Sequence, residues 1–309
     1  MLPPGSMKRF VFWAIVAAAL WATTGQAQTE RQVTFCSYNL KNWLQMERFQ
    51  NGKRTEGVGK PEKEKAAAVR ILTAIHPDIL GVCEIGTEED LRDLQARLRA
   101  VGIDLPYSES AHGGDPVRRL GILSRLPIVE KNSQTGLKYL IGNQVFAVSR
   151  GFLDVTVKLR EGLDLRCVGV HLKSKREVPE ADQGLMRRNE AHLLRRHTDT
   201  ILRAKPETKL LLYGDFNEHK AEAAIVEIEG VPGMELSMNR LNLKDSRGET
   251  WTHYWEYQDL YSRFDYFFVS RPLQSYVDKR ASYIFDALPH GEASDHRPLV
   301  MKIDLVKSR

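Results

Sequence analysis

Three short segments in the second half of the chain place polar side chains at the ends of apolar strands. These segments are LLYGDFNE around Asp215 and Asn217, SRFDYFFVS around Asp265, and ASDHRPLV around Asp295 and His296. Apolar runs of this length and composition are typical of buried strands, and a buried carboxylate is costly unless it is paired or holds a metal. We therefore expect one assembled polar site at the rim of a sheet, suited to phosphate chemistry with Mg²⁺ or a similar cation.

The first half of the chain adds two candidate metal residues at strand ends. Asn39 ends the run VTFCSYN, and Glu84 ends the run ILGVCE. A carboxylate at position 84 is explained either by metal coordination or by a solvent-facing strand end. Asn39 either forms a turn after its strand or orients a metal-bound carboxylate or a phosphate oxygen, and both alternatives stay open.

A histidine followed by a short basic segment is the next candidate. His171 ends the strand-like run VGVH, and Lys173, Ser174 and Lys175 follow in a predicted loop. A phosphoryl transition state spreads negative charge over its oxygens, so a histidinium with ammonium and hydroxyl donors nearby would stabilise it. A lone histidine at a strand end is often structural, but the Lys-Ser-Lys segment favours a function in phosphate binding.

The late segments suggest roles for their polar residues. Asp215 and Asn217 lie on the same side of an extended chain, where a carboxylate and an amide together hold an attacking water and a phosphate oxygen. A Gly-Asp turn is the alternative, although it leaves the preceding apolar strand unexplained. His296 is expected to take a proton from water or to stabilise charge, with Asp265 as the carboxylate that fixes its tautomer. Asp295 is expected to bind the metal directly or through water.

Other charged residues carry weaker patterns. Arg118, Arg119 and Arg150 are candidates for contacts with phosphates, with surface roles favoured, and Arg118 is kept among the candidate phosphate-binding residues. Five further histidines lie outside any motif: His192, His197, His219, His253 and His290.

The order of predicted elements indicates a layered α/β domain. The predicted elements are a strand at 33–40, a polar loop to residue 59, a helix at 63–75, a strand ending at Glu84, a helix at 87–102, alternating strands at 146–159 and 163–172, and a helix at about 180–204. Pro61 marks the start of the first helix, and Thr87 with Asp90 resembles a capping box for the second. This mixture predicts mixed sheets. No repeat or composition break divides 28–309, so we predict one domain.

The N-terminus has the form of an export signal. Lys8 and Arg9 precede the uncharged stretch 10–22, and small residues follow near Ala27. A membrane anchor needs about 18 or more apolar residues, whereas this stretch has 13. We therefore predict a signal peptide, residues 1–27, and an exported protein in the periplasm or outside the cell; an uncleaved anchor is the alternative.

Charge and cysteine content leave several questions open. The formal charge of +5 is mildly basic, which permits a polyanionic substrate without requiring one. Cys36, Cys83 and Cys167 lie in apolar runs, and an odd number leaves at least one unpaired. Buried free thiols are favoured, with a Cys36–Cys83 disulfide as the alternative because export exposes the chain to oxidants.

Seven segments in order resemble one known group of enzymes. SYNL, CEIG, GILSR, VHLKS, GDFN, RFDY and SDHRPL look like the endonuclease/exonuclease/phosphatase superfamily, which contains DNase I, exonuclease III-like AP endonucleases, sphingomyelinases and inositol polyphosphate phosphatases. The resemblance runs from Val33 to Asp304. It implies a four-layered α/β sandwich in which two mixed sheets pack face to face with helices outside and one site lies at the sheet edge.

The resemblance also implies roles for the candidates. Asn39 and Glu84 match the first amide and the principal metal ligand, His171 matches the phosphate-stabilising histidine, and Asp295 with His296 completes the metal and acid/base set. Whether His296 or Asp215 is the base stays open. The segment HLKSK is similar to HFKSK of secreted bacterial nucleases, which favours an exported nuclease.

The predicted function is therefore that of a secreted, Mg²⁺-dependent phosphodiesterase acting on DNA or RNA, with Mn²⁺ or Ca²⁺ as alternative cations. The same chemistry on a phospholipid head group or a small phosphate ester is the main alternative, although the sequence has no clear apolar hairpin beyond the aromatic segment WTHYWEYQDLY. An inactive binding protein is a remote alternative. We expect a monomer and no protein partner.

Overall fold

Apolar side chains on both faces of the central strands place these strands between two layers. In β1 (Gln32–Trp43), Val33 and Phe35 belong to one buried cluster, and Cys36 and Tyr38 belong to another. Because successive side chains of a strand point to opposite faces, the sheet that contains β1 must be covered on both sides.

The computed structural model describes residues 31–50, 52–287 and 290–306. Residues Gln32–Arg309 form one unit, and the description below refers to it. The predicted signal peptide, residues 1–27, lies outside the described residues. None of the helices in the described ranges has the length and apolar character that a membrane span requires.

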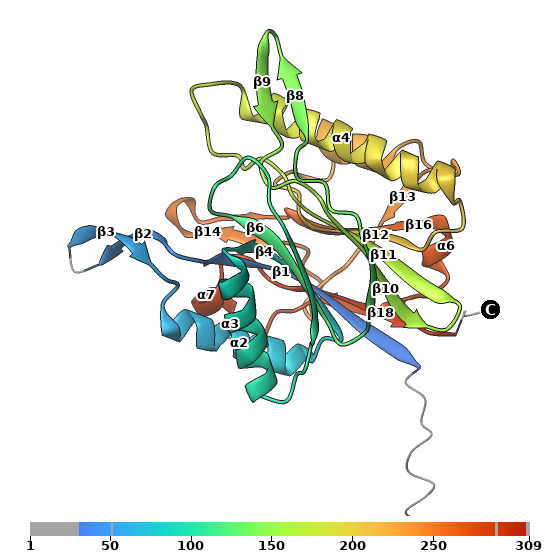
Figure 1. Cartoon of the computed structure of the whole chain (residues 1–309), viewed down its shortest axis with the longest axis horizontal. Helices are drawn as coiled ribbons and strands as arrows, with labels where there is room; N and C mark the ends of the chain where they lie inside the picture. Colours follow the sequence, from blue (N-terminus) through green and yellow to red (C-terminus); the bar gives the residue numbers. More distant parts are fainter. Residues whose placement is uncertain (1–30, 51, 288–289, 307–309) are drawn as a thin grey trace, which may run out of the picture. The chain divides into compact units, whose positions relative to one another are not determined.

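Two six-stranded mixed sheets form the centre of the unit (Figure 1). In spatial order the first sheet contains β17 (Val277–Ile284), β18 (Leu299–Asp304), β1, β4 (Ile79–Ile85), β6 (Arg119–Ser124) and β5 (Tyr107–Ala111). The second contains β13 (Met238–Arg240), β16 (Asp265–Ser270), β12 (Leu210–Asp215), β11 (Leu163–His171), β10 (Leu153–Arg160) and β7 (Ile128–Lys131). The pairs β1–β4 and β11–β12 are parallel.

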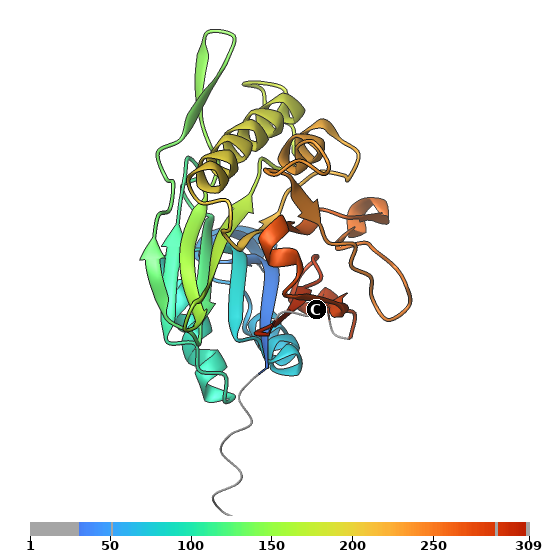
Figure 2. The same ribbon diagram turned by 90° about the vertical axis from the view of Figure 1, so that its right-hand side faces the viewer.

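Helices cover the outer face of each sheet (Figures 1 and 2). The first sheet packs against α2 (Glu62–Ile75) and α3 (Glu88–Ala100), with α7 (His290–Ala293) beside α2. The second packs against α4 (Gln183–Ala204) and α5 (Ala223–Glu229), while α6 (Arg271–Gln274) follows β16. The predicted four-layered sandwich is therefore confirmed, and the predicted capping box of Thr87 and Asp90 begins α3.

A tyrosine fills the space between the two sheets. Tyr213 of β12 is buried, and its ring lies 4.9 Å from that of Phe35, centroid to centroid. A side chain at Gly81 of β4 or Gly169 of β11 would overlap this ring. The glycines therefore allow the sheets to pack closely around one large aromatic group.

Two predicted segments differ from the structure. The predicted polar loop up to residue 59 contains a hairpin of β2 (Met46–Gln50) and β3 (Lys53–Val58). Much of β3 is exposed, so it lacks the alternating pattern that marks a half-buried strand. The predicted strand 146–159 is interrupted, because β9 (Gln144–Ala147), which pairs with β8 (Lys138–Ile141), ends before a left-handed turn at Gly151 (φ 66°).

The three cysteines are buried free thiols. Cys36 faces the layer of α2 and α3, whereas Cys83 faces the space between the sheets. Cys83 is paired in register with Asn39 and not with Cys36. The alternative of a Cys36–Cys83 disulfide is therefore wrong, because the two thiols lie on opposite faces of the same sheet.

Candidate active site

Six strand ends bring the predicted site residues to one edge of the sandwich. β1 carries Asn39, β4 carries Glu84, β11 ends at His171, β12 ends at Asp215, β16 begins at Asp265, and the segment before β18 carries Asp295 and His296. In the second sheet, Asp215 is paired in register with His171 on one side and with Asp265 on the other. The topology thus concentrates the candidates from both halves of the chain.

Several residues at this edge have left-handed backbone conformations. Glu84 (φ 61°), Asn217 (φ 51°), Lys41 (φ 48°) and Asn42 (φ 60°) are not glycines, yet all have positive φ. Such conformations cost free energy and persist where surrounding structure holds them, often at functional sites. The surrounding structure therefore holds the backbone at these strand ends in sharp turns.

The Asn39 amide lies between two carboxylates from different sheets. Its Nδ2 donates to Asp215 Oδ2 at 3.1 Å and is 3.4 Å from Glu84 Oε1. Its Oδ1 accepts a hydrogen bond from Lys41 N at 3.0 Å, while Glu84 Oε2 accepts one from Asn42 N at 2.9 Å. The amide thus connects the carboxylates without neutralising their charges.

Asp215 is a buried carboxylate with an unusual proton affinity. Burial raises its pKa to about 7; Asp265 and Glu84 add to the shift, and His296 opposes it. Its Oδ1 accepts a hydrogen bond from Asn217 N at 2.8 Å, which fixes its orientation. Asp215 therefore exchanges a proton near neutral pH, as a general base does.

His296 forms a dyad with Asp265. The distance from His296 Nδ1 to Asp265 Oδ2 is 2.8 Å, and His296 Nε2 lies 3.7 Å from Asp215 Oδ2. Burial lowers the pKa of His296, but Asp265 and Asp215 outweigh it and raise the pKa to about 10. Thr252 Oγ1 accepts the backbone N–H of Asp265 at 3.1 Å. His296 is therefore held as an imidazolium, with Nε2–H directed to the centre of the site.

His171 has the opposite charge state. Its Nε2 lies 3.5 Å from Asp215 Oδ2, and its buried Nδ1 has no hydrogen-bond partner among the described residues. Burial, then the charges of Arg150, His296 and Arg118, hold its pKa well below the usual range. The lowered pKa favours the neutral imidazole over the expected histidinium.

The remaining metal candidate, Asp295, directly precedes His296 in the chain. Its Oδ1 is 3.4 Å from Ser294 Oγ, and its carbonyl accepts a hydrogen bond from Tyr254 N. Burial raises its pKa, but His296, Lys41 and other cations outweigh this effect and lower it. Within the described ranges, no hydrogen bond or ion pair joins Asp295 to Glu84, so Asp295 stays a predicted ligand.

Two groups of residues are candidates for holding a divalent cation. Ligand atoms of Asp215, Asp265 and His296 lie within 4.8 Å of one another, but His296 is protonated and Asp265 is bound to it. Glu84, with the Asn39 amide beside it, instead offers hard oxygen ligands, and the Arg118 guanidinium lies 3.9 Å from Glu84. We favour this second set, because its donor chemistry fits Mg²⁺.

The predicted phosphate-binding residues line the area beside the site with different partners. Arg118 Nε donates to Asn42 Oδ1 at 2.9 Å and lies 3.9 Å from Glu84 Oε2. Lys173 Nζ donates to two backbone carbonyls, one of them that of Ser174. Lys175 pairs with Glu218. A phosphate at Lys175 would therefore compete with a carboxylate, whereas Arg118 lies next to the site.

Two residues with only weak sequence patterns, Arg150 and His253, also lie near the site. Arg150 is only 7% exposed, so the favoured surface role is wrong. The His253 ring lies 4.7 Å from that of His296, centroid to centroid, and burial, followed by the charge of His296, lowers its pKa to about 4. Position 253 lies in the aromatic segment noted above, and that context was the only signal available for it.

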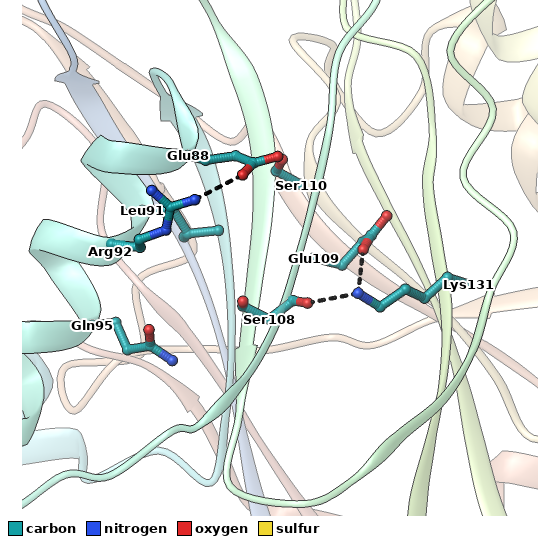
Figure 3. Close-up of a pocket in the computed structure, with 8 residues that line it drawn as sticks. All are labelled: Glu88, Leu91, Arg92, Gln95, Ser108, Glu109, Ser110 and Lys131. Atoms are coloured by element: carbon teal, nitrogen blue, oxygen red, sulfur yellow. Dashed lines mark hydrogen bonds and ion pairs between the residues drawn. The ribbon is translucent and has the colours of Figure 1, made fainter.

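Another pocket, between α3, β5 and β7, is unrelated to this edge (Figure 3). Its charged residues pair with each other: Arg92 lies 3.0 Å from Glu88, and Lys131 lies 2.7 Å from Glu109. Because these charged side chains are already paired, the pocket offers little unpaired charge to a ligand.

Comparison with known proteins agrees with this architecture. A model of the Endonuclease/Exonuclease/phosphatase family matches residues 54–296, which cover most of the chain and every candidate site residue from Glu84 to His296. The fold and site define a phosphoester hydrolase of two packed sheets. The chain belongs to the endonuclease/exonuclease/phosphatase family.

Solved structures with low sequence identity have the same fold. An endonuclease/exonuclease/phosphatase from Bacteroides vulgatus has a TM-score of 0.61 at 16% identity, over 89% of this chain and 99% of its own. Truncated TDP2 from Caenorhabditis elegans has a TM-score of 0.60 at 16% identity, over 88% and 98%. Sphingomyelinase C from Streptomyces griseocarneus has a TM-score of 0.59 at 14% identity, over 88% and 99%. A search of curated proteins found no match.

Proposed function

We propose that this protein is an exported, divalent-metal-dependent phosphodiesterase that hydrolyses nucleic acid. The protein belongs to a family whose members are phosphoester hydrolases. The observation that carries the proposal is the buried Asp215, which lies among Asn39, His171 and His296 with a pKa of about 7. This combination provides a base, a proton donor and hydrogen-bond donors around one phosphate.

Each residue has a distinct part in the proposed reaction. Ionised Asp215 accepts a proton from the attacking water as the water oxygen bonds to phosphorus, and Asn217 keeps the carboxylate oriented. The bond from phosphorus to the leaving oxygen breaks in the same step, and the leaving alkoxide takes a proton from solvent water. His296, held as an imidazolium by Asp265, donates Nε2–H to a phosphoryl oxygen as charge develops. His171 contributes a second imidazole on the other side of Asp215. A bound cation at Glu84 would polarise the phosphate and lower its negative charge.

An open groove beside the site supports nucleic acid as the substrate. The groove has a volume of about 810 Å³, and its lining carries four cationic residues, Arg118, Arg150, Lys173 and Arg176, and three acidic residues, Asp115, Glu177 and Glu180. Its cations are available for contacts with phosphates, and its open shape admits a chain that continues beyond the scissile bond.

An exposed aromatic hairpin favours a second candidate, hydrolysis of a phospholipid head group. β14 (His253–Trp255), the 3-10 turn η1 (Glu256–Gln258) and β15 (Leu260–Ser262) form this hairpin, which the sequence did not clearly indicate. Trp255 is 46% exposed and Tyr257 is 85% exposed. Large exposed aromatic side chains suit a membrane interface, and one neighbour in fold is named a sphingomyelinase.

One assay separates these functions. Purified protein is incubated with plasmid DNA, RNA, sphingomyelin vesicles and bis-p-nitrophenyl phosphate, with Mg²⁺ or EDTA. We expect Mg²⁺-dependent cleavage of nucleic acid and loss of about 10²–10⁴-fold in rate for His296→Ala, because the proton donor is removed. His171→Ala is expected to lose activity by a smaller factor.

His192→Ala is the matched control, because this histidine is exposed and pairs with Glu227 on the outer helices. Cleavage of vesicles with intact DNA and RNA would replace the first function by the second. Binding of all substrates without turnover would identify a binding protein, and full activity of His296→Ala would refute the site.

Export is proposed from the sequence alone. The test is N-terminal sequencing of the protein recovered from the extracellular and periplasmic fractions, where we expect a new terminus near Ala27. Recovery from the cytoplasm with the first 27 residues still attached would contradict the proposal.

A further inference from the structure

A buried arginine lines the open groove beside the active site. Arg150 occupies the turn between β9 and β10, directly before Gly151, and lines the groove together with Arg118. It is 7% exposed. A buried guanidinium is costly unless anions or carbonyl groups satisfy it, so its partners indicate what it is for.

The protein satisfies only part of this guanidinium. Nη2 lies 3.0 Å from Asp115 Oδ2, and Asp115 is the only carboxylate among the described residues that pairs with Arg150. Its buried Nε has no hydrogen-bond partner in the described part of the chain. A guanidinium has five N–H donors, so Arg150 retains donors for another anion.

Asp115 also holds a second arginine. Its Oδ2 lies 3.5 Å from Arg118 Nη1, and its Oδ1 accepts the backbone N–H of Arg118 at 3.1 Å. One carboxylate therefore stands between two guanidinium groups. Arg118 in turn lies 3.9 Å from Glu84, so the cluster begins at the edge of the active site.

A buried glutamate fixes the position of this cluster relative to the site. Glu190 of α4 is fully buried, and its Oε1 accepts the backbone N–H and the hydroxyl of Ser149 at 2.8 and 2.7 Å. Its Oε2 accepts the backbone N–H of Lys173 at 2.6 Å. The same carboxylate thus connects the residue before Arg150 to the segment after His171.

The electrostatic effect of Arg150 agrees with this placement. Its charge contributes to the lowered pKa of both His171 and Lys173, after burial in each case. Arg150 is therefore close to the residues that surround the scissile phosphate, but the distances given above join it to Asp115 and not to the catalytic carboxylates.

We propose that Arg150 and Arg118 form a subsite for a second phosphate, the one next to the scissile phosphate along a nucleic-acid chain. The proposal rests on the proposed function and adds that the preferred substrate carries a second phosphate. A guanidinium pair with free donors suits a phosphate with several acceptor oxygens. A substrate with a single phosphodiester group leaves this subsite without its ligand, whereas an oligonucleotide fills it.

The test compares dinucleotides that differ by one terminal phosphate. The substrates are a dinucleoside monophosphate, its 5′-phosphorylated form and its 3′-phosphorylated form, each assayed with Mg²⁺ for KM and kcat. We expect one phosphorylated form to have a KM about tenfold lower than that of the unphosphorylated dinucleotide, because a charge-assisted bidentate contact is added. Equal KM values for all three substrates would overturn the proposal without any variant.

Variants assign the effect to the arginine. In Arg150→Gln the ratio of the KM values is expected to fall towards one, and in Arg150→Lys it is expected to take an intermediate value, because the charge remains but the bidentate geometry is lost. Arg203→Gln, an exposed residue of α4 paired with Asp199, is the control and should retain the full ratio. Thermal melting of each variant establishes that it is folded, and Arg118→Gln provides an independent test if Arg150→Gln does not fold.

Failure of this proposal differs from failure of the proposed function. Cleavage of dinucleotides with a KM ratio that Arg150→Gln leaves unchanged would refute the subsite alone. An equal loss of kcat on all substrates in Arg150→Gln would also refute it, because the residue would then act on the scissile phosphate itself. Cleavage of sphingomyelin vesicles without any cleavage of nucleotides would refute the function on which the proposal rests.

Discussion

Two aspartates of the same sheet show how differently this protein treats a buried carboxylate. Asp154 of β10 is 0% exposed and Asp215 of β12 is 1% exposed. Asp154 accepts hydrogen bonds from Arg166 at 2.8 and 2.7 Å, and its Oδ2 lies 2.8 Å from His197 Nε2. Asp215 has Asp265 and Glu84 among its neighbours and lacks a comparable guanidinium.

The proton affinities follow from these surroundings. Burial opposes ionisation of Asp154, but hydrogen bonds from His197 and Arg166 outweigh it and lower the pKa. Burial raises the pKa of Asp215 to about 7. A buried carboxylate that is paired with a cationic side chain of the protein stabilises the fold. A buried carboxylate that has other acids as neighbours is suited to binding a proton or a metal cation from solution.

The largest expected effect is the loss of stability when Asp154 is replaced. Asp154→Asn should lower the free energy of unfolding at pH 7 by about 3–5 kcal/mol, because Arg166 loses its charged partner. Since the folded pKa of Asp154 is depressed, this contribution is present above the unfolded value and is lost as the pH falls through the folded value. Urea unfolding of both proteins at pH 7 and pH 3 measures it. A difference that is as large in acid as at neutral pH would contradict the ion-pair explanation.

The second prediction concerns the divalent cation that Glu84 is proposed to bind. Mg²⁺ at about 100 times its dissociation constant should stabilise the fold by about 2.7 kcal/mol, seen as a higher melting temperature than in EDTA. Glu84→Gln should remove most of this increase, because it removes a charged oxygen ligand. Glu109→Gln, on the strand next to β6 and paired with Lys131, is the control. An unchanged increase in Glu84→Gln would show that the cation binds elsewhere.

The smallest expected effect is a gain of stability when Asp215 is replaced, which is opposite in sign to the effect at Asp154. Because the pKa of Asp215 is raised to about 7, its ionisation costs stability as the pH rises from about 4 to 7, and the full cost is present above pH 7. In EDTA at pH 8, Asp215→Asn should therefore be more stable than the unchanged protein, with little difference at pH 3.5. Thermal melting at both pH values measures this. A loss of stability at pH 8 would mean that the attraction to His296 dominates.

Strand ends made much of the site predictable from sequence. A buried strand is recognised from a local apolar run, and a charged residue at its end stands out because burial would be costly. Asp215, Asp265 and His296 were found in this way, and the structure brings them together. Asn39 and Glu84 needed the ordered set of motifs as well, because each one alone had a common alternative explanation.

Features that depend on tertiary contacts could not be predicted in this way. The turn at Ser149 and Arg150 is fixed by Glu190, which follows 40 residues later on another layer. Nothing near Arg150 in the sequence indicates that it is buried. His253 likewise gains its position from a backbone bridge to His296. The local sequence pattern predicts the strands. The environment of the site residues depends on contacts between segments that are distant in the sequence.

The position of β18 has a consequence for how activity begins. This strand lies between β17 and β1, and Gln32 is paired in register with Asp304. The sheet that holds Asn39 and Glu84 therefore closes only after β18 has docked between earlier strands, a pairing across 272 residues of sequence that forms slowly. A chain in which β18 has not yet docked should consequently lack the proposed activity, because the strand next to the one that carries Asn39 is missing from the sheet.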